Sequence, residues 1–149
     1  MRLFWPCIVF SQRVKCIKSD QCNERSGKGC DTTFIINFVA TLCSPCIKEL
    51  PDFEKFGTAF KSEKLKVLLV SVNFKSELNS SVIKYVKKEN IKGEVFLLDD
   101  KDQQEYIDSI DTSWSGSIPA TLFFKNGKRL FVEKDLTFDD LQKMLKSLN

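Results

Sequence analysis

Runs of hydrophobic residues alternate with helical patterns along most of the chain. Continuous apolar runs rich in β-branched and aromatic residues are typical of buried strands, and they predict strands at residues 33–40, 65–72 and 95–98. Apolar residues spaced by three and four positions predict helices at residues 44–61 and 102–109, and in a segment that begins near Asn79 or Ser80. This alternation favours a central sheet with helices on both faces.

The end of the chain shows a different pattern, a hairpin followed by one helix. Residues 121–124 and 129–132 are its two arms, and Asn126-Gly127 is a dipeptide typical of two-residue hairpin turns. Thr137-Phe138-Asp139-Asp140 then starts a helix with a capping sequence. Its apolar side chains recur at intervals of three and four: Phe138, Leu141, Met144, Leu145 and Leu148. We therefore expect an α/β fold with a central mixed β-sheet flanked by helices.

The first 31 residues show neither pattern. They end in the turn-prone Ser26-Gly27-Lys28-Gly29, so we expect residues 1–31 to be an irregular lead-in and residues 32–149 to form one domain. A length of 149 residues is enough for a single domain with a hydrophobic core. Residues 1–12 carry one positive charge and about eight apolar residues, the lower limit for a secretory signal segment. A frayed N-terminus is the alternative interpretation.

Composition removes several classes of function. The chain has no histidine, which excludes Ser-His-Asp and Cys-His catalysis and mixed Cys/His zinc sites. Its 23 basic and 20 acidic residues are interspersed and leave a formal net charge of +3, so no nucleic-acid-binding surface is expected. No apolar stretch reaches the roughly 18 residues of a membrane-spanning helix, so no transmembrane segment is expected. Motifs for nucleotide or flavin binding are missing, and we expect no bound cofactor.

The six cysteines are the main candidates for chemistry. Cys43 and Cys46 are three positions apart, where the first predicted strand passes into the first predicted helix. Two cysteines at this spacing can close a disulfide, and the first would lie among the unpaired N–H groups of a helix N-terminus, which favour its thiolate. The other four cysteines precede this motif: Cys7, Cys16, Cys22 and Cys30. An even number of cysteines permits further disulfides but does not show them.

Two separate segments resemble one family. Ile36 to Pro51, INFVATLCSPCIKELP, resembles the active-site segment of the thioredoxin-like thiol-disulfide oxidoreductases of the TlpA/ResA type. Gly116 to Phe124, GSIPATLFF, resembles the loop and strand that carry the cis-proline of that family. The 72 residues between Cys46 and Pro119 leave room for the additional helix-strand unit of this branch. The resemblance covers residues 33–149 and implies a thioredoxin-like fold with that insertion.

The resemblance implies roles for the residues of the first motif. Cys43 would be the attacking cysteine, which forms a mixed disulfide with the substrate, and Cys46 would resolve it. Pro45 suits the first helical turn, where its missing N–H would be unpaired anyway, and Ser44 and Pro45 are expected to contact the substrate. Glu49 matches a glutamate that tunes the cysteine pair. Three residues after Cys46, it could be partly buried and accept that cysteine's proton; the alternative is a solvated glutamate paired with a lysine.

In the second motif, the resemblance implies a cis peptide bond before Pro119. This bond would bring the backbone of Ile118 beside the dithiol, where an extended substrate segment can pair with it. Leu42 and Val39 stand where aromatic residues are usual in the family, which affects partner recognition. Trp114 is expected to pack in the core or the loop rather than to form part of the substrate-facing rim.

We therefore expect an enzyme that reduces or exchanges protein disulfides through Cys43 and Cys46 by way of a mixed disulfide. The resemblance further implies protein disulfide substrates and an upstream dithiol protein as the electron donor. It also implies a location outside the cytoplasm, and we expect the chain to be monomeric.

Two alternatives stay open. In the first, Cys43 and Cys46 join two of the upstream cysteines Cys16, Cys22 and Cys30 in a four-thiolate zinc site, although the upstream spacing is not a second Cys-x-x-Cys. The second is a thiol peroxidase, although Ala40 stands where a Thr-x-x-Cys motif would have threonine. Copper delivery by the thiolate pair is weaker still, because histidine is missing.

Overall fold

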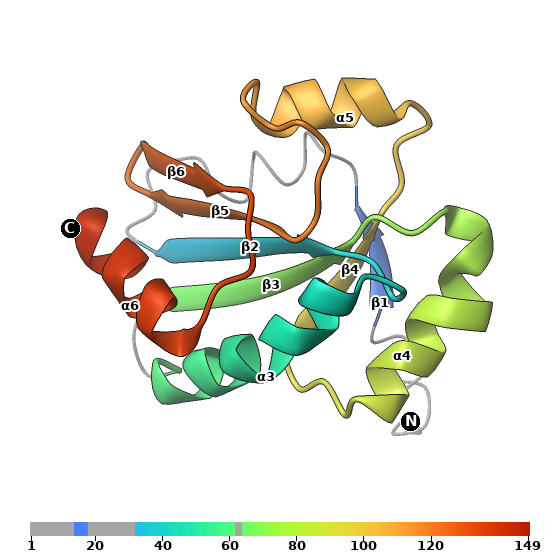
Figure 1. Ribbon diagram of the computed structural model, residues 1–149, viewed down its shortest axis with the longest axis horizontal. Helices are drawn as coiled ribbons and strands as arrows, with labels where there is room; N and C mark the ends of the chain where they lie inside the picture. Colours follow the sequence, from blue (N-terminus) through green and yellow to red (C-terminus); the bar gives the residue numbers. More distant parts are fainter. Residues whose placement is uncertain (1–13, 18–31, 62–63) are drawn as a thin grey trace, which may run out of the picture.

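The computed structural model describes residues 14–17, 32–61 and 64–149 (Figure 1). The strands form a six-stranded mixed sheet in the order β1-β4-β3-β2-β5-β6. Their bounds are β1 Val14–Ile17, β2 Thr33–Val39, β3 Leu65–Ser71, β4 Glu94–Leu98, β5 Ala120–Lys125 and β6 Lys128–Val132. Strands β1 to β4 pair in parallel, whereas β5 pairs antiparallel with both β2 and β6.

Helices cover both faces of this sheet. Their bounds are α3 Ser44–Ala59, α4 Ile83–Lys88, α5 Gln103–Ile110 and α6 Phe138–Ser147. Helix α5 packs on one face, and α3, α4 and α6 pack on the other (Figure 1). The predicted α/β architecture with a mixed sheet is therefore confirmed.

The central strand β2 is buried along its whole length, and its two faces contact different parts of the core. The side chains that pack with α5 are Phe34, Ile36 and Phe38. Ile35 and Val39 pack on the opposite side, with α3. Because side chains alternate along a strand, Asn37 shares this second face. Strand β2 thus places the buried amide of Asn37 beneath α3 and then leads into the N-terminus of that helix.

Strand β1 corrects one prediction. Residues 1–31 are expected to be irregular, but Val14–Ile17 pairs in parallel with Val95–Leu98 and extends the sheet. A strand of four residues is too short to show a periodic pattern, and its pairing with β4 is what defines it. The rest of the segment, including the possible signal segment and three of its four cysteines, lies outside the described residues.

The helical segment after β3 begins earlier than predicted. A 3₁₀ turn at Lys75–Glu77 and a π-helical stretch at Leu78–Val82 precede α4, whereas the sequence pattern starts at Asn79 or Ser80. The Glu77 carboxylate accepts a hydrogen bond from the backbone N–H of Phe74 at 3.0 Å and thereby caps the first turn. In this cap, Glu77 reaches back three residues to Phe74. An aromatic residue at the N-cap is not part of a usual capping sequence, so the pattern did not predict this start.

The β5-β6 hairpin has the predicted two-residue turn. Asn126 and Gly127 have φ angles of 48° and 82°, and positive values at both positions are what a type I′ turn requires. The hairpin matters for the site because β5 begins immediately after Pro119.

Replacing Gly127 by alanine should lower the free energy of unfolding by about 1 kcal/mol, because a side chain disfavours positive φ. No atom lies within 4 Å of the added Cβ, so backbone strain is the only cost expected. The control is Gly57→Ala inside α3, where the Cβ would meet Val67 at an ordinary 3.7 Å. This control should raise the free energy of unfolding by up to about 1 kcal/mol. Urea unfolding measures both, and changes of equal sign would contradict this account of the turn.

Candidate active site

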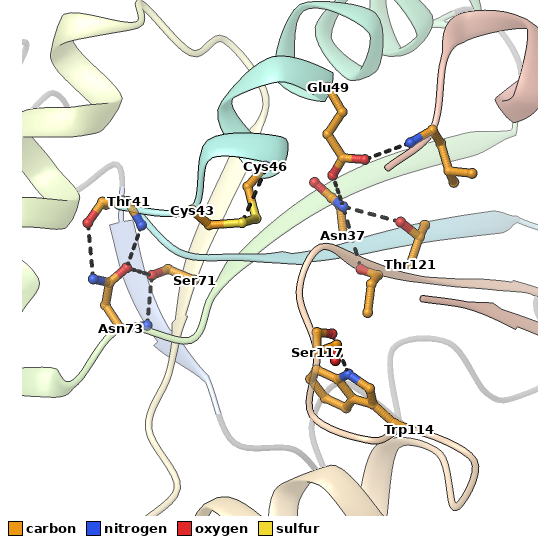
Figure 2. Close-up of a disulfide and its surroundings, with 12 residues drawn as sticks. Asn37, Thr41, Cys43, Cys46, Glu49, Ser71, Asn73, Trp114, Ser117 and Thr121 are labelled. Carbon is orange, nitrogen blue, oxygen red and sulfur yellow. Dashed lines mark hydrogen bonds between the residues drawn. A yellow bond between two sulfur atoms is a disulfide. The ribbon is translucent and has the colours of Figure 1, made fainter. Parts of the chain in front are cut away.

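Cys43 and Cys46 lie at the N-terminus of α3 and are joined by a disulfide (Figure 2). Their sulfur atoms are 2.18 Å apart and their Cα atoms 5.2 Å apart. Cys43 is the N-cap residue of the helix, and its Sγ accepts a hydrogen bond from the backbone N–H of Cys46 at 3.3 Å. The Cys43 sulfur therefore lies where the N–H groups of the first helical turn stabilise a thiolate.

The two cysteines differ in exposure. Cys43 is half-buried, whereas Cys46 is 2% exposed and packs in an apolar cluster with Val39 and Leu50. Ser44 and Pro45, between them, are exposed. An incoming molecule can reach Cys43 more easily than Cys46.

Asn73 holds the loop that carries Cys43. Its Oδ1 accepts a hydrogen bond from the backbone N–H of Thr41, and its Nδ2 donates to Thr41 Oγ1, both at 3.1 Å (Figure 2). Ser71, at the end of β3, donates to the same Oδ1 at 2.7 Å. Sequence analysis missed Asn73. The available signal was a polar residue just after a predicted strand, near the carboxyl end of the sheet.

The cis-proline motif lies beside the two cysteines in the folded protein. The peptide bond between Ile118 and Pro119 is cis, which confirms the prediction, and Pro119 is buried just before β5. Ile118 is half-buried and packs against the apolar cluster that contains Cys46, against which Cys43 also packs. The fold therefore brings together two motifs that are far apart in the sequence.

Trp114 braces the loop before the cis-proline. It is buried, its ring centroid lies 5.0 Å from that of Phe38, and its Nε1–H donates to the carbonyl oxygen of Ser117 at 2.8 Å. The prediction of a packing residue is confirmed, and the indole also has a polar role in fixing the loop.

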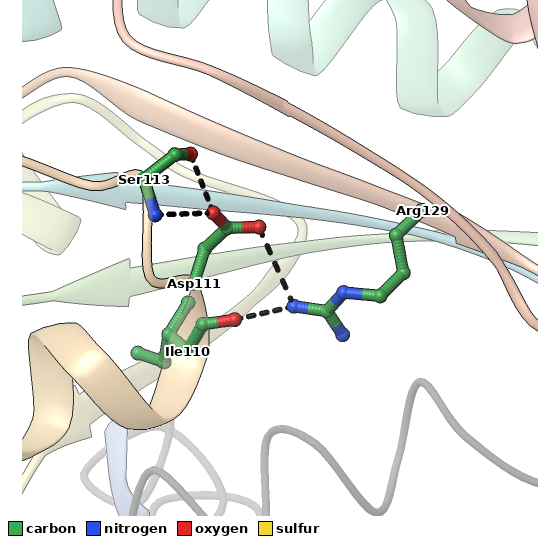
Figure 3. Close-up of polar contacts among 4 residues, drawn as sticks. All are labelled: Ile110, Asp111, Ser113 and Arg129. Atoms are coloured by element: carbon green, nitrogen blue, oxygen red, sulfur yellow. Dashed lines mark hydrogen bonds and ion pairs between the residues drawn. The ribbon is translucent and has the colours of Figure 1, made fainter.

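A polar contact from the hairpin fixes the start of the same loop (Figure 3). The Arg129 guanidinium, on β6, donates to the carbonyl oxygen of Ile110 and lies 3.9 Å from the Asp111 carboxylate. Asp111 in turn accepts from the backbone N–H of Ser113 at 2.9 Å. The end of α5 is thereby tied to the hairpin that follows Pro119.

Glu49 is only 3% exposed, on the face of α3 that packs on the sheet. Its Oε2 accepts from Asn37 Nδ2 at 2.8 Å, and its Oε1 accepts from the backbone N–H of Leu136 at 3.0 Å (Figure 2). Burial raises the pKa of Glu49 to about 7, although both hydrogen bonds lower it, and the nearby Asp135 adds a further rise. This position excludes the solvated alternative, and the carboxyl group titrates near neutral pH.

Asn37 links Glu49 to the strand that follows the cis-proline. Its Nδ2 also donates to Thr121 Oγ1 at 3.2 Å and to the carbonyl oxygen of Ala120 at 3.5 Å. Sequence analysis missed this residue too. The signal was present as a single amide within the otherwise apolar run that forms β2.

The structure gives the zinc alternative no support. Among the described residues there is no group of three or more side chains that could hold a metal ion. Cys43 and Cys46 are joined to each other, and Cys16 is exposed on β1, at the edge of the sheet. Cys22 and Cys30 lie outside the described residues. None of the helices in the described part is long and apolar enough to span a membrane.

Three solved structures illustrate what this fold is similar to. A thiol:disulfide interchange protein of the thioredoxin family from Chlorobium tepidum TLS is 21% identical over 79% of this chain and 80% of that one, with a TM-score of 0.61. A thioredoxin-related protein from Neisseria meningitidis serogroup B is 18% identical over 83% of this chain and 87% of that one, with a TM-score of 0.68. A secreted disulfide oxidoreductase from Mycobacterium tuberculosis is 15% identical over 78% of this chain and 82% of that one, with a TM-score of 0.58. The predicted thioredoxin-like fold is confirmed.

A comparison with family models identifies the family. The model of the AhpC/TSA family matches residues 15–130, which include both cysteines of the motif and the cis-proline. A search of curated protein sequences gives no match. Because the family match spans well over half of the chain, this thioredoxin-like protein belongs to the AhpC/TSA family.

Proposed function

We propose that the chain is a thiol-disulfide oxidoreductase that reduces or exchanges disulfides in other proteins. The observation that carries this proposal is the Cys43–Cys46 disulfide at the N-terminus of α3, beside the cis-Pro119 loop. The thioredoxin-like fold and the family match support the same activity.

The reaction runs in two exchange steps. In the reduced protein, the Cys43 thiolate attacks one sulfur of a substrate disulfide; that S–S bond breaks, a mixed disulfide forms, and one substrate thiolate leaves. Cys46 then loses its proton and attacks the Cys43 sulfur, which closes the Cys43–Cys46 disulfide and releases the second substrate thiol. Two electrons have passed from the protein dithiol to the substrate. The disulfide in the structure corresponds to the product of this half-reaction.

Glu49 is the proposed acceptor of the Cys46 proton. With a pKa of about 7, it is partly ionised at neutral pH and can both take up and return a proton. In this disulfide form, its oxygens accept hydrogen bonds from Asn37 and Leu136. We propose that these two donors hold the carboxylate in place while it exchanges a proton with Cys46, three residues earlier on the same helix.

The surface around the disulfide supports a protein substrate. In the described part of the chain, the large hydrophobic side chains left exposed are Leu42, Ile47 and Phe74. Leu42 precedes Cys43 and is 91% exposed, and Phe74, which is 78% exposed, follows the asparagine that holds the Cys43 loop. We propose that Ser44, Pro45 and the Ile118–Pro119 backbone contact an extended substrate segment beside this apolar rim.

The disulfide must be reduced again before the next turnover. We propose that a second dithiol protein supplies the two electrons by the same exchange chemistry. We propose that the chain is monomeric and works outside the cytoplasm, and a secreted protein of similar fold supports this location. Cell fractionation together with sedimentation of the purified chain tests location and oligomeric state.

A glutathione redox titration with alkylation and peptide mapping tests the proposed activity. A reversible Cys43–Cys46 couple with a potential between roughly −100 and −350 mV is expected. Hydrogen peroxide should be consumed much more slowly than a protein disulfide is reduced. A pair that does not cycle, or peroxide consumption as fast as disulfide reduction, would overturn the proposal.

Replacing Cys46 by serine should trap the substrate. Cys43 can still attack a substrate disulfide, but the mixed disulfide has no internal thiol to resolve it, so a covalent complex should accumulate. Multiple-turnover reduction should fall on the order of 100-fold or more. Non-reducing electrophoresis and mass spectrometry measure the complex. Cys43→Ser is the control, and it should form no complex. Trapping by Cys43→Ser alone would reverse the assigned roles, and equal trapping by the two variants would contradict them.

Replacing Glu49 by glutamine should slow the resolving step. In the unsubstituted protein, the rate at which Cys46 resolves a preformed mixed disulfide should rise with pH through about 7, as Glu49 ionises. In Glu49→Gln, this rise should disappear and the rate at neutral pH should fall roughly 100-fold. Single-turnover quenched-flow measurements follow the step. An unchanged pH profile would remove Glu49 from the proton path.

Glu49 should also make stability depend on pH. Its pKa rises from 4.5, taken for the unfolded chain, to about 7 in the folded protein, so the folded state binds more protons in between. The Glu49 contribution to the free energy of unfolding should therefore decrease by about 3 kcal/mol as pH rises through this window.

Urea unfolding of the disulfide form, with and without Glu49→Gln, measures this difference as a function of pH. The value for Glu49→Gln is subtracted from that for the unsubstituted protein because other carboxyl groups also titrate. A carboxylate with a lowered pKa, such as Asp140, makes the free energy of unfolding rise with pH instead of fall. A difference that is flat between pH 4.5 and 7 would contradict the raised pKa.

A further inference from the structure

The side-chain amide of Asn37 is buried completely, and its two ends are used very unequally. Its Nδ2 lies near three acceptors: Glu49 Oε2 at 2.8 Å, Thr121 Oγ1 at 3.2 Å and the Ala120 carbonyl oxygen at 3.5 Å. Among the described residues, Asn37 Oδ1 has no hydrogen-bond partner. A buried acceptor without a donor destabilises a fold, so this amide calls for an explanation.

The ionised carboxylate of Glu49 explains the orientation. If the amide were turned over, Oδ1 would face Glu49 Oε2 and the Ala120 carbonyl oxygen, and three acceptors would meet without a donor among them. Only the Thr121 hydroxyl could donate to Oδ1 in that orientation. A negative charge on Glu49 therefore selects the arrangement in which Nδ2 faces it and Oδ1 stays unpaired.

The other groups that face Glu49 do not replace this donor. Asp135, just before α6, raises the pKa of Glu49, and Tyr85 on α4 has its own pKa raised to about 12, so it stays neutral at working pH. Cys46, on the same helix, is the proposed proton donor and carries no charge in the disulfide. Two hydrogen bonds oppose the rise in the Glu49 pKa that burial causes. One comes from the backbone N–H of Leu136 and the other from the side-chain amide of Asn37, so only the second can be removed by a substitution.

We propose that Asn37 is a positioning residue for the exchange reaction: its Nδ2, which also contacts Thr121 Oγ1, holds the Glu49 carboxylate in place and keeps the ionised form accessible at neutral pH. The inference rests on the proposed function of Glu49. It adds that the position and pKa of the proton acceptor on α3 depend on two neighbouring strands, β2 and β5, which pair at Asn37 and Thr121.

Asn37→Leu is the test, because leucine has a similar size and lacks both the donor and the unpaired acceptor. The titration midpoint of Glu49 should rise by roughly one to two pH units. The carboxyl ¹³C shift of Glu49 in the disulfide form reports this midpoint, and its signal is identified by its loss in Glu49→Gln. The pH profile of the Cys46 resolving step should move upward together with it.

Two further variants separate positioning from packing. Thr121→Val should shift the Glu49 midpoint in the same direction but by less, because Nδ2 loses its contact with Thr121 and keeps its hydrogen bond to Glu49. Ser71→Ala removes another buried hydroxyl, on β3, whose hydrogen bonds are with Asn73, and it should leave the midpoint unchanged. If Asn37→Leu does not fold, Asn37→Asp serves instead: two adjoining carboxyl groups should share a proton, with one apparent midpoint strongly raised.

A folded Asn37→Leu protein with an unchanged Glu49 midpoint would overturn the inference, as would a shifted midpoint with an unshifted rate profile. The carboxyl titration needs no substrate. Failure of the inference is therefore distinguishable from failure of the proposed activity, in which the unsubstituted protein would not reduce disulfides at all.

Discussion

The packing of α3 against the sheet is the interaction on which the rest of the site depends. The helix buries Cys46, Leu50, Phe53 and Phe56, and Pro45 occupies its first turn, where no N–H is lost. Because this apolar face is anchored, the free N–H groups of the N-terminus stay at the Cys43 sulfur. The same packing carries Glu49 into the interior, three residues beyond Cys46. One helix thus presents an accessible sulfur at its end and a desolvated carboxyl group nearly two turns further along.

Burial and hydrogen bonding act against each other at Glu49, and their balance sets its chemistry. Desolvation favours the neutral acid, whereas the donors from Asn37 and Leu136 favour the ion. The resulting pKa of about 7 suits a group that must take up and release a proton at neutral pH. In a chain without histidine, the proposed role of this buried glutamate is the one that an imidazole usually has. The cost is a polar group inside an apolar core, and its two hydrogen-bond donors come from β2 and from the segment before α6.

The parts of the site differ in how firmly they are held. Asn73 fixes the Cys43 loop with two side-chain hydrogen bonds to Thr41 and is itself held by Ser71 on β3. Trp114 and Arg129 brace the loop that ends at Pro119. The exposed side chain of Leu42 lies on the Cys43 loop, and that of Phe74 directly follows Asn73. These hydrogen bonds and ring contacts keep the sulfur atoms and the cis-proline in register, while Leu42 and Phe74 remain exposed beside them.

The sequence by itself determined the features that depend on neighbouring residues. Apolar runs encode β2, β3 and β4, Asn126-Gly127 encodes the hairpin turn, and the two family motifs identified the cysteine pair and the cis-proline. It could not determine β1, which pairing with β4 defines, or the partners of Glu49. Asn37 and Leu136 lie 12 and 87 positions from Glu49, and no local pattern encodes such contacts. Only the tertiary structure decided that this glutamate is buried and hydrogen-bonded, because desolvation is a property of the packed core and not of any segment in it.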